Sequence, residues 1–196
     1  MANDYSEQDL VDLHNDHVLP TYFPAQLRLV RGALAWVWDS AGNRYLDFTS
    51  GISVCNLGHC HPRVTAAIQR QAAKLVHVSN LFLNEHQPRL AALIAKHSFG
   101  GKVFFGNSGA EANEGMIKFA RYWGHDKGRH EIICMEESFH GRTLATLAAT
   151  GRTKYRKGFQ PDVQGFVHVP FNDADAAKAA ISEKTAAVLL EPIQGE

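Results

Sequence analysis

Three stretches of this chain carry residue types that could bind an anion or take part in polar chemistry. The first, 104–113, reads Phe-Phe-Gly-Asn-Ser-Gly-Ala-Glu-Ala-Asn, which is typical of a strand that passes through a glycine turn into a helix. The start of such a helix offers unpaired N–H groups and partial positive charge, and so can bind phosphate. Gly109 lets the backbone approach an anion, and Ser108 adds a hydroxyl donor. From this stretch alone, simple capping of the helix by Asn107 or Ser108 is the favoured alternative.

The second stretch, 137–143, reads Glu-Ser-Phe-His-Gly-Arg-Thr and follows an apolar run that predicts a strand. Ligands of open α/β sheets collect at the carboxyl ends of the strands. The ring of Phe139 could lie against a planar group, and the guanidinium of Arg142 could bind a carboxylate through two parallel hydrogen bonds. The alternative, with Phe139 in the core and Arg142 in a surface ion pair, is equally compatible with this stretch.

The third stretch, 191–196, places Glu191 and Glu196 in the loop that follows the last apolar run. Two carboxylates at the edge of a sheet could pair with cations in a binding site. A solvated turn is the favoured alternative when this stretch is taken alone. The role of these carboxylates therefore depends on what the fold places beside them.

A fourth stretch, 55–62, holds four soft metal ligands, so zinc has to be considered: Cys55, His59, Cys60 and His61. No second ligand pair follows at the spacing of a zinc finger or zinc ribbon. Three adjacent ligands also cannot easily converge on one tetrahedral ion. A tight loop shaped by Gly58 and Pro62 is the favoured interpretation, and we expect no metal site.

Composition excludes several other classes of function. The chain has 196 residues, with 20 basic and 20 acidic side chains that are not clustered, which gives no support for a nucleic-acid or anionic-membrane partner. No apolar run approaches the ~20 residues that span a bilayer, and the polar start lacks the layout of a signal peptide. Three cysteines predict a reducing, cytoplasmic location without structural disulfides. There is no Gly-x-Ser-x-Gly, Gly-x-Gly-x-x-Gly or Walker motif.

A framework of strands and helices must position these stretches. Apolar runs predict strands at 103–105, 131–135, 166–169 and 186–190, and helical spacing predicts helices at 62–75, 86–97, 109–123, 142–150 and 173–181. In the helix 109–123, the expected inward positions are Met116, Ile117, Ala120 and Trp123. Two aromatic-rich runs, 35–38 and 44–48, predict a β-hairpin that belongs to a second, smaller domain. The alternation of strands and helices predicts the α/β class, with a sheet covered on both faces.

The chain stops just after the last predicted strand and its loop. A parallel sheet that ended there would leave the edge of its last strand exposed. We therefore expect this chain to be the first part of a longer, truncated protein.

Taken together and in order, these stretches resemble the N-terminal half of the class-III (ω-amino) aminotransferases, pyridoxal 5'-phosphate (PLP) enzymes of fold type I. The resemblance covers nearly the whole chain after about Leu19 and rests on six blocks: 38–48, 50–52, 57–62, 107–113, 139–143 and 191–196. Within the family, the sequence is most similar to acetylornithine aminotransferases in four places: 75–81, 104–114, Tyr155 and 165–170. Departures are Ala110, where Thr is frequent, the cysteines at 55 and 60, and Phe82-Leu83, where a Tyr pair is common.

The resemblance implies a cofactor role for several residues. The backbone N–H groups of Gly109 and Ala110, with Ser108, would hold the PLP phosphate. Phe139 would stack on the pyridine ring, and Glu191 would support the site from nearby. The fold implied is a mixed, mostly parallel sheet covered by helices, with 1–60 belonging to the small domain and 61–196 forming the first part of the large PLP-binding domain.

The resemblance also implies substrate contacts. Arg142, helped by Tyr22, would bind the α-carboxylate of the amino donor. Glu196 resembles the family's gate carboxylate, which pairs with a C-terminal arginine while the donor reacts and releases that arginine for 2-oxoglutarate. The implied reaction is a ping-pong transamination of a terminal amine, and the lysine that binds PLP lies beyond 196, so no catalytic residue is expected in this chain.

We accordingly expect an acetylornithine:2-oxoglutarate aminotransferase of arginine biosynthesis, homodimeric when full length. The isolated chain is expected to be inactive and poorly soluble, because part of a sheet exposes apolar surface. The alternatives within the family are ornithine δ-aminotransferase and the aminotransferases of succinylornithine and 4-aminobutyrate. The alternative from another class is a non-catalytic module that binds phosphate or a carboxylate.

Overall fold

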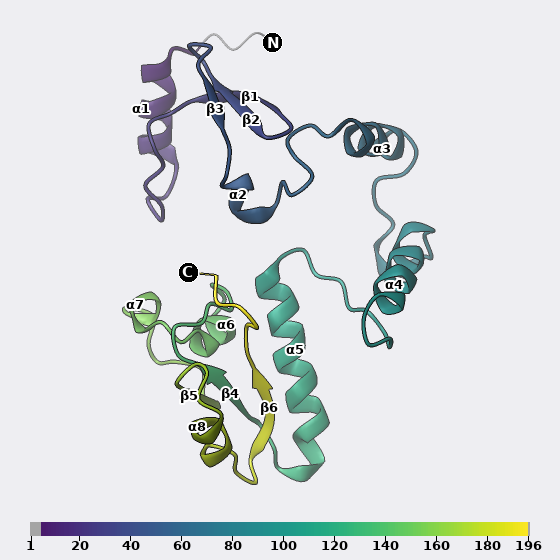
Figure 1. Cartoon of the computed structure of the whole chain (residues 1–196), viewed down its shortest axis with the longest axis vertical. Coiled ribbons are helices and arrows are strands. Elements are labelled where there is room, and N and C mark those ends of the chain that lie inside the picture. Colours follow the sequence, from purple (N-terminus) through teal and green to yellow (C-terminus); the bar gives the residue numbers. More distant parts are fainter. Residues whose placement is uncertain (1–4, 196) are drawn as a thin grey trace. The chain divides into compact units, whose positions relative to one another are not determined.

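The computed structural model describes residues 5–195, which form two compact units, one up to Asn84 and one from Glu85 (Figure 1). The first unit contains α1 (Glu7–His17), β1 (Leu29–Ala33), β2 (Trp36–Asp39), β3 (Arg44–Leu46), α2 (Ser50–Ser53), α3 (Pro62–Ala72) and the 3-10 helix η1 (Ser79–Leu81). The second contains α4 (His86–Lys96), α5 (Gly109–Gly124), the 3-10 helix η2 (His125–Lys127), β4 (Glu131–Met135), α6 (Leu144–Ala149), α7 (Thr153–Arg156), β5 (Phe166–Val169), α8 (Ala174–Ala179) and β6 (Thr185–Leu189). Among the helices of the described residues, none is long and apolar enough to cross a membrane.

The first unit is built on an antiparallel sheet in the order β1-β2-β3. The predicted hairpin is confirmed as the pair β2–β3, with Trp36 opposite Leu46. Asp39 closes its turn by accepting hydrogen bonds from the backbone N–H of Asn43 at 2.8 Å and from the Tyr45 hydroxyl at 2.8 Å. Hydrogen bonds from the Asn43 side chain and then from Tyr45 hold the pKa of Asp39 below its usual value despite its desolvation. The strand β1, which the sequence did not predict, adds a third strand to this hairpin.

A tight loop over 55–61 leads into α3, as the sequence predicted. Gly58 has φ +90°, and a Cβ there would lie 2.7 Å from the Cα of Leu34, so only glycine fits. Pro62 is the first residue of α3. In the part of the chain that the structure describes, no group of three or more His, Cys, Asp or Glu residues could hold a metal ion.

Asp47 anchors this loop to the sheet. Its carboxylate lies 2.7 Å from Nε2 of His59 and accepts hydrogen bonds from the Thr49 hydroxyl at 2.7 Å and the Ser50 backbone N–H at 3.1 Å. The Thr49 side chain first, and then His59, hold the pKa of Asp47 well below its usual range. The ionised carboxylate therefore links two segments that lie apart in the sequence.

We expect replacement of Asp47 by Asn to lower the melting temperature near neutral pH and to flatten its dependence on acid. Because the pKa of Asp47 is lower in the folded state, its contribution is complete above the unfolded value of about 4. The contribution is lost as the pH falls below that value toward the folded pKa. Thermal melts of both proteins between about pH 6 and 2 measure this effect. Parallel curves for the wild type and Asp47→Asn would contradict it.

The second unit contains a parallel sheet in the order β5-β4-β6, with α5 and α6 on one face and α8 on the other (Figure 1). On the central strand β4, Ile132 and Cys134 face the α5–α6 side and pack against Ile117. Ile133 and Met135 face the α8 side. The continuous apolar run of β4 is explained by its burial on both faces. The α/β prediction and the strands near 131–135, 166–169 and 186–190 are confirmed.

Two sequence predictions about this unit are wrong. Residues 103–105 form no strand, because no segment of the described residues pairs with them and a strand needs a hydrogen-bonded neighbour. Met116 and Trp123 remain 51% and 49% exposed, so the face of α5 that packs on the sheet is narrower than predicted and centres on Ile117, with Ala120 beside it.

Candidate functional site

The N-terminus of α5 is capped by its own side chains. Ser108 is the N-cap residue, and its Oγ accepts a hydrogen bond from the backbone N–H of Glu111 at 3.1 Å. The Glu111 carboxylate turns back and accepts from the backbone N–H of Asn107. The capping interpretation is therefore confirmed, and it accounts for the placement of Glu111 in the first turn.

Capping leaves two donors of this helix end available. Within the described residues, the backbone N–H groups of Gly109 and Ala110 have no hydrogen-bond acceptor. Apart from its chain neighbours and the backbone of α5, no atom lies within 4 Å of the position that a Cβ of Gly109 would occupy, so no other described segment packs against this glycine. Capping and anion binding are thus compatible, because they use different N–H groups of the same helix end.

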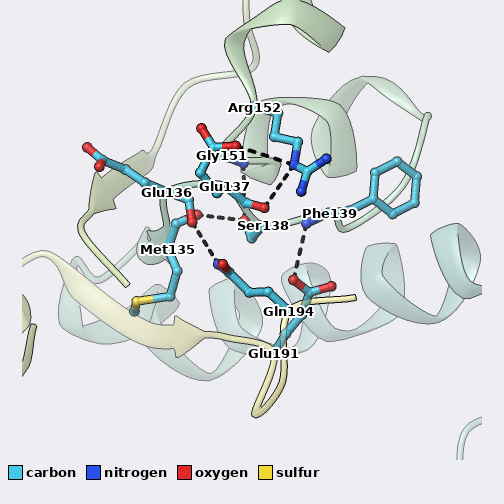
Figure 2. Close-up of polar contacts among 9 residues, drawn as sticks. All are labelled: Met135, Glu136, Glu137, Ser138, Phe139, Gly151, Arg152, Glu191 and Gln194. Atoms are coloured by element: carbon cyan, nitrogen blue, oxygen red, sulfur yellow. Dashed lines mark hydrogen bonds and ion pairs between the residues drawn. The ribbon is translucent and has the colours of Figure 1, made fainter. Parts of the chain in front are cut away.

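The 136–141 loop at the carboxyl end of β4 is held by a buried hydroxyl. Ser138 is 0% exposed; its Oγ donates to the carbonyl oxygen of Met135 at 2.6 Å and accepts from the backbone N–H of Gly151 at 3.1 Å (Figure 2). The backbone N–H of His140 donates to Oγ1 of the buried Thr150 at 3.0 Å. The loop is therefore tied to the segment that follows α6.

Arg152 holds the same loop from the start of α7. Its Nε donates to the carbonyl oxygen of Glu137 at 3.0 Å and lies 3.6 Å from the Glu137 carboxylate (Figure 2). Glu137 has φ +56°, in the left-handed region that non-glycine residues rarely adopt. A conformation of this kind persists only where the surroundings hold it, and Arg152 supplies one such contact.

The loop also contacts α5. The side-chain amide of Asn113 donates to the carbonyl oxygen of His140 at 2.6 Å, and the Thr143 hydroxyl donates to the Glu114 carboxylate. These contacts join the first two chemical stretches predicted from the sequence, 104–113 and 137–143.

The 191–194 loop completes the arrangement. The Glu191 carboxylate accepts a hydrogen bond from the backbone N–H of Phe139 at 3.3 Å, and Gln194 donates to the carbonyl oxygen of Glu136 at 2.7 Å (Figure 2). The Phe139 ring points away from this network, and the side chain is 39% exposed. The carboxyl ends of β4 and β6 thus bring Phe139 and Glu191 together, and Phe139 is not a core residue.

Arg142 presents a free cation at this site. Its guanidinium carbon lies 4.2 Å from the ring centroid of Tyr155 and 5.5 Å from that of Phe139. The side chain is exposed, and no carboxylate of the described residues pairs with it. The surface ion pair considered from the sequence is therefore absent here, and the N–H fork of Arg142 is available to a ligand.

The imidazoles of buried His140, in this loop, and of partly buried His168, on β5, are close enough to interact electrostatically. His140 is 4% exposed, and burial, followed by the proximity of His168, lowers its pKa. Burial also lowers the pKa of His168, whose Nε2 lies 3.1 Å from the carbonyl oxygen of Ala149. Both lowered pKa values favour the neutral rings near neutral pH, so the positive charge at this site comes from Arg142, Arg152 and the helix end. Burial raises the pKa of the Cys134 thiol to about 12, which makes it unreactive.

The two remaining predicted residues are placed differently. Tyr22 belongs to the first unit, where it is 70% exposed and lines a groove of about 740 Å³ between α1 and the 20–28 segment. Glu196 lies outside the described residues. Roles for both stay predictions.

The sequence assigned no role to the residues that support the site rather than face it: Ser138, Thr150, Gly151, Arg152 and Tyr155. The one available signal was Thr-Gly-Arg at 150–152, a polar group directly after an apolar helix. That signal does not say which loop these residues contact.

The sequence of residues 20–196 matches the profile of the aminotransferase class-III family. The chain belongs to the class-III aminotransferases. An acetylornithine aminotransferase from Caldanaerobacter subterraneus subsp. tengcongensis is 50% identical over 190 residues, which cover 95% of this chain and 48% of that relative. The expected family is confirmed.

Solved structures of class-III aminotransferases have the same fold. The ornithine aminotransferase from Toxoplasma gondii superposes with a TM-score of 0.91 at 32% identity, covering 97% of this chain and 46% of that one. The acetylornithine aminotransferase from Elizabethkingia anophelis gives a TM-score of 0.78 at 31% identity, covering 98% and 46%. Members of this family use PLP. The chain spans about half the length of the curated relatives it matches.

Proposed function

We propose that the protein to which this chain belongs is an acetylornithine:2-oxoglutarate aminotransferase. The observation that carries the proposal is the convergence of three loops, which brings the open helix end of α5, the exposed Phe139 ring and the Glu191 carboxylate onto adjoining elements. Identity of 50% to acetylornithine aminotransferases over most of the chain supports the choice of donor.

The residues present fit PLP. Two acceptor-free N–H groups, of Gly109 and Ala110, together with the Ser108 hydroxyl, suit its phosphate, and no other described segment packs against Gly109. Phe139 offers an exposed ring face for the pyridine, and Glu191 fixes the backbone at Phe139. When bound, PLP supplies the electron sink that allows an amino group to be exchanged for a carbonyl.

The residues of this chain bind and orient the substrate. Arg142 binds the α-carboxylate of the donor through its free N–H fork, and Tyr22 assists it. Glu196 acts as the gate carboxylate that distinguishes the donor from 2-oxoglutarate.

The assay that tests the proposal uses the full-length protein, PLP and 2-oxoglutarate with four amino donors: acetylornithine, ornithine, succinylornithine and 4-aminobutyrate. We expect the highest kcat/KM for acetylornithine. A higher kcat/KM for another donor would show that this donor, and not acetylornithine, is the preferred substrate of this family member. No glutamate formed from any donor would contradict the enzyme and favour a module that only binds phosphate or carboxylate.

Ornithine is the second candidate donor. The fold superposes closely on an ornithine aminotransferase, and Phe82-Leu83 stands where a Tyr pair is common in acetylornithine enzymes. Both side chains are exposed in this chain, at 70% and 99%. The ratio of kcat/KM for acetylornithine to that for ornithine decides between the two donors.

We also propose a cytoplasmic homodimer. The first unit exposes large apolar side chains that a second copy could cover: Phe48, Ile52, Val54, Leu81, Phe82 and Leu83. Sparse free cysteines, with Cys134 buried as a thiol, suit a reducing compartment. A monomeric mass from light scattering of the full-length protein would contradict the dimer.

The division into a small-domain segment, 1–60, and the first part of a large domain, 61–196, stays a prediction.

A further inference from the structure

The half-buried ring of Tyr155, on α7, contacts both Phe139 and Arg142. Its centroid lies 6.0 Å from that of Phe139, with the planes at 82° in an edge-to-face arrangement. The Arg142 guanidinium carbon lies 4.2 Å from the same Tyr155 centroid. We propose that Tyr155 is a positioning residue that holds Arg142 ready to bind the donor carboxylate. This inference rests on the proposed function.

Stacking on a ring suits a binding arginine better than an ion pair does. The N–H groups of a guanidinium lie in its plane, and the guanidinium carbon of Arg142 lies over the Tyr155 ring, where the contact uses no N–H group as a hydrogen-bond donor to a carboxylate. A carboxylate partner within the protein would occupy the N–H groups that the substrate needs. Tyr155 instead orients Arg142 and leaves its planar fork free for two parallel hydrogen bonds.

Tyr155 is itself held in place by the segment that fixes the 136–141 loop. Its backbone N–H donates to the carbonyl oxygen of Arg152 at 3.1 Å, and Arg152 bonds Glu137. At the other end of α7, Arg156 donates to Asp162 at 3.3 Å. The loop is therefore held by the N-cap residue of α7, and the ring that contacts Arg142 lies on the same short helix.

The effect of Tyr155 should depend on the donor carboxylate. Acetylornithine carries this group, whereas N-acetylputrescine has the same acyl group and terminal amine but no carboxylate. In full-length Tyr155→Leu, we expect the KM for acetylornithine to rise about tenfold with a small change in kcat. The KM of Tyr155→Leu for N-acetylputrescine should stay within about twofold of the wild-type value. Tyr155→Phe keeps the ring, so its KM for acetylornithine should be close to that of the wild type. Tyr122→Leu, which changes a tyrosine of α5 that is 83% exposed, is the matched control.

A binding measurement tests the role without turnover. N2-acetylnorvaline keeps the carboxylate and acyl group of the donor but lacks its amine, so it cannot react. By calorimetry, its Kd should weaken about tenfold in Tyr155→Leu and remain near the wild-type value in Tyr155→Phe. If Tyr155→Leu does not fold, Tyr155→Met, an unbranched side chain that can fill the space, takes its place.

The outcomes separate this inference from the proposed function. A wild type that transaminates acetylornithine, with Tyr155→Leu shifting both donors alike, would overturn the role of Tyr155 and leave the function standing. A wild type that does not transaminate would overturn the proposed function. The Kd of N2-acetylnorvaline would then test the role of Tyr155 by itself. A Kd unaffected by Tyr155→Leu, or no binding to the wild type, would overturn the role of Tyr155.

Discussion

Replacing Arg142 by leucine in the full-length protein is expected to lower kcat/KM for acetylornithine by about 10²- to 10³-fold. Two arginines lie at the carboxyl end of β4; Arg152 is paired with Glu137, whereas no carboxylate of the described residues pairs with Arg142. Without it, the donor carboxylate would be desolvated without a partner. Steady-state kinetics with acetylornithine measure the loss.

Arg142→Lys is the matched control for this prediction. Lysine keeps the positive charge but lacks the planar fork, so we expect an intermediate loss of about tenfold. Kinetics with N-acetylputrescine should change little in either variant, because that donor has no carboxylate. An equal loss for both donors would show that Arg142 supports the fold or the cofactor rather than the substrate.

The second large effect is expected at Gly151. A Cβ there would lie 2.7 Å from the Cα of Glu136 and closer still to the carbonyl oxygen of Met135. Both are backbone atoms at the end of the central strand, so they cannot move aside as a flexible side chain could. We expect Gly151→Ala to destabilise the protein by about 3 kcal/mol. The added methyl group should push the 150–152 segment away from β4. This movement should lengthen the hydrogen bond from the Gly151 N–H to the Ser138 hydroxyl and weaken PLP binding.

Urea unfolding and PLP titration of the full-length protein measure the two consequences. Gly195→Ala is the control, because no atom lies within 4 Å of its Cβ position. We expect Gly195→Ala to change stability by less than about 0.5 kcal/mol. A stable Gly151→Ala with normal PLP affinity would show that the 136–141 loop tolerates a shift away from the 150–152 segment.

Much of the framework could be predicted from local sequence. The hairpin follows from two aromatic runs around a turn, and α3 begins at Pro62 because the first turn of a helix does not need its missing N–H. The strand β4 follows from an apolar run without alternation, as expected for a strand covered on both faces. Residues 103–105 were mistaken for a strand because apolar character is local, whereas a strand requires a partner.

The chemical residues could also be proposed from the sequence, because Ser108 precedes a predicted helix and Phe139, Arg142 and Glu191 follow predicted strands. Only the tertiary structure decided between the alternatives that each stretch left open. Ser108 caps α5 while two neighbouring N–H groups stay free, and Phe139 is exposed rather than in the core. The difference lies in contacts distant in sequence, such as that between Phe139 and Glu191.

What the sequence determined by itself was the family, the α/β class and the residue types that could bind phosphate, a ring and a carboxylate. The class and the residue types follow from capping and periodicity, which are patterns within a few residues, and the family follows from the order of short motifs along the chain. What the tertiary structure alone decided was the support of the site by Ser138, Thr150, Gly151, Arg152 and Tyr155. These residues act through contacts within or to the 136–141 loop, and a local sequence pattern does not show which loop a residue contacts.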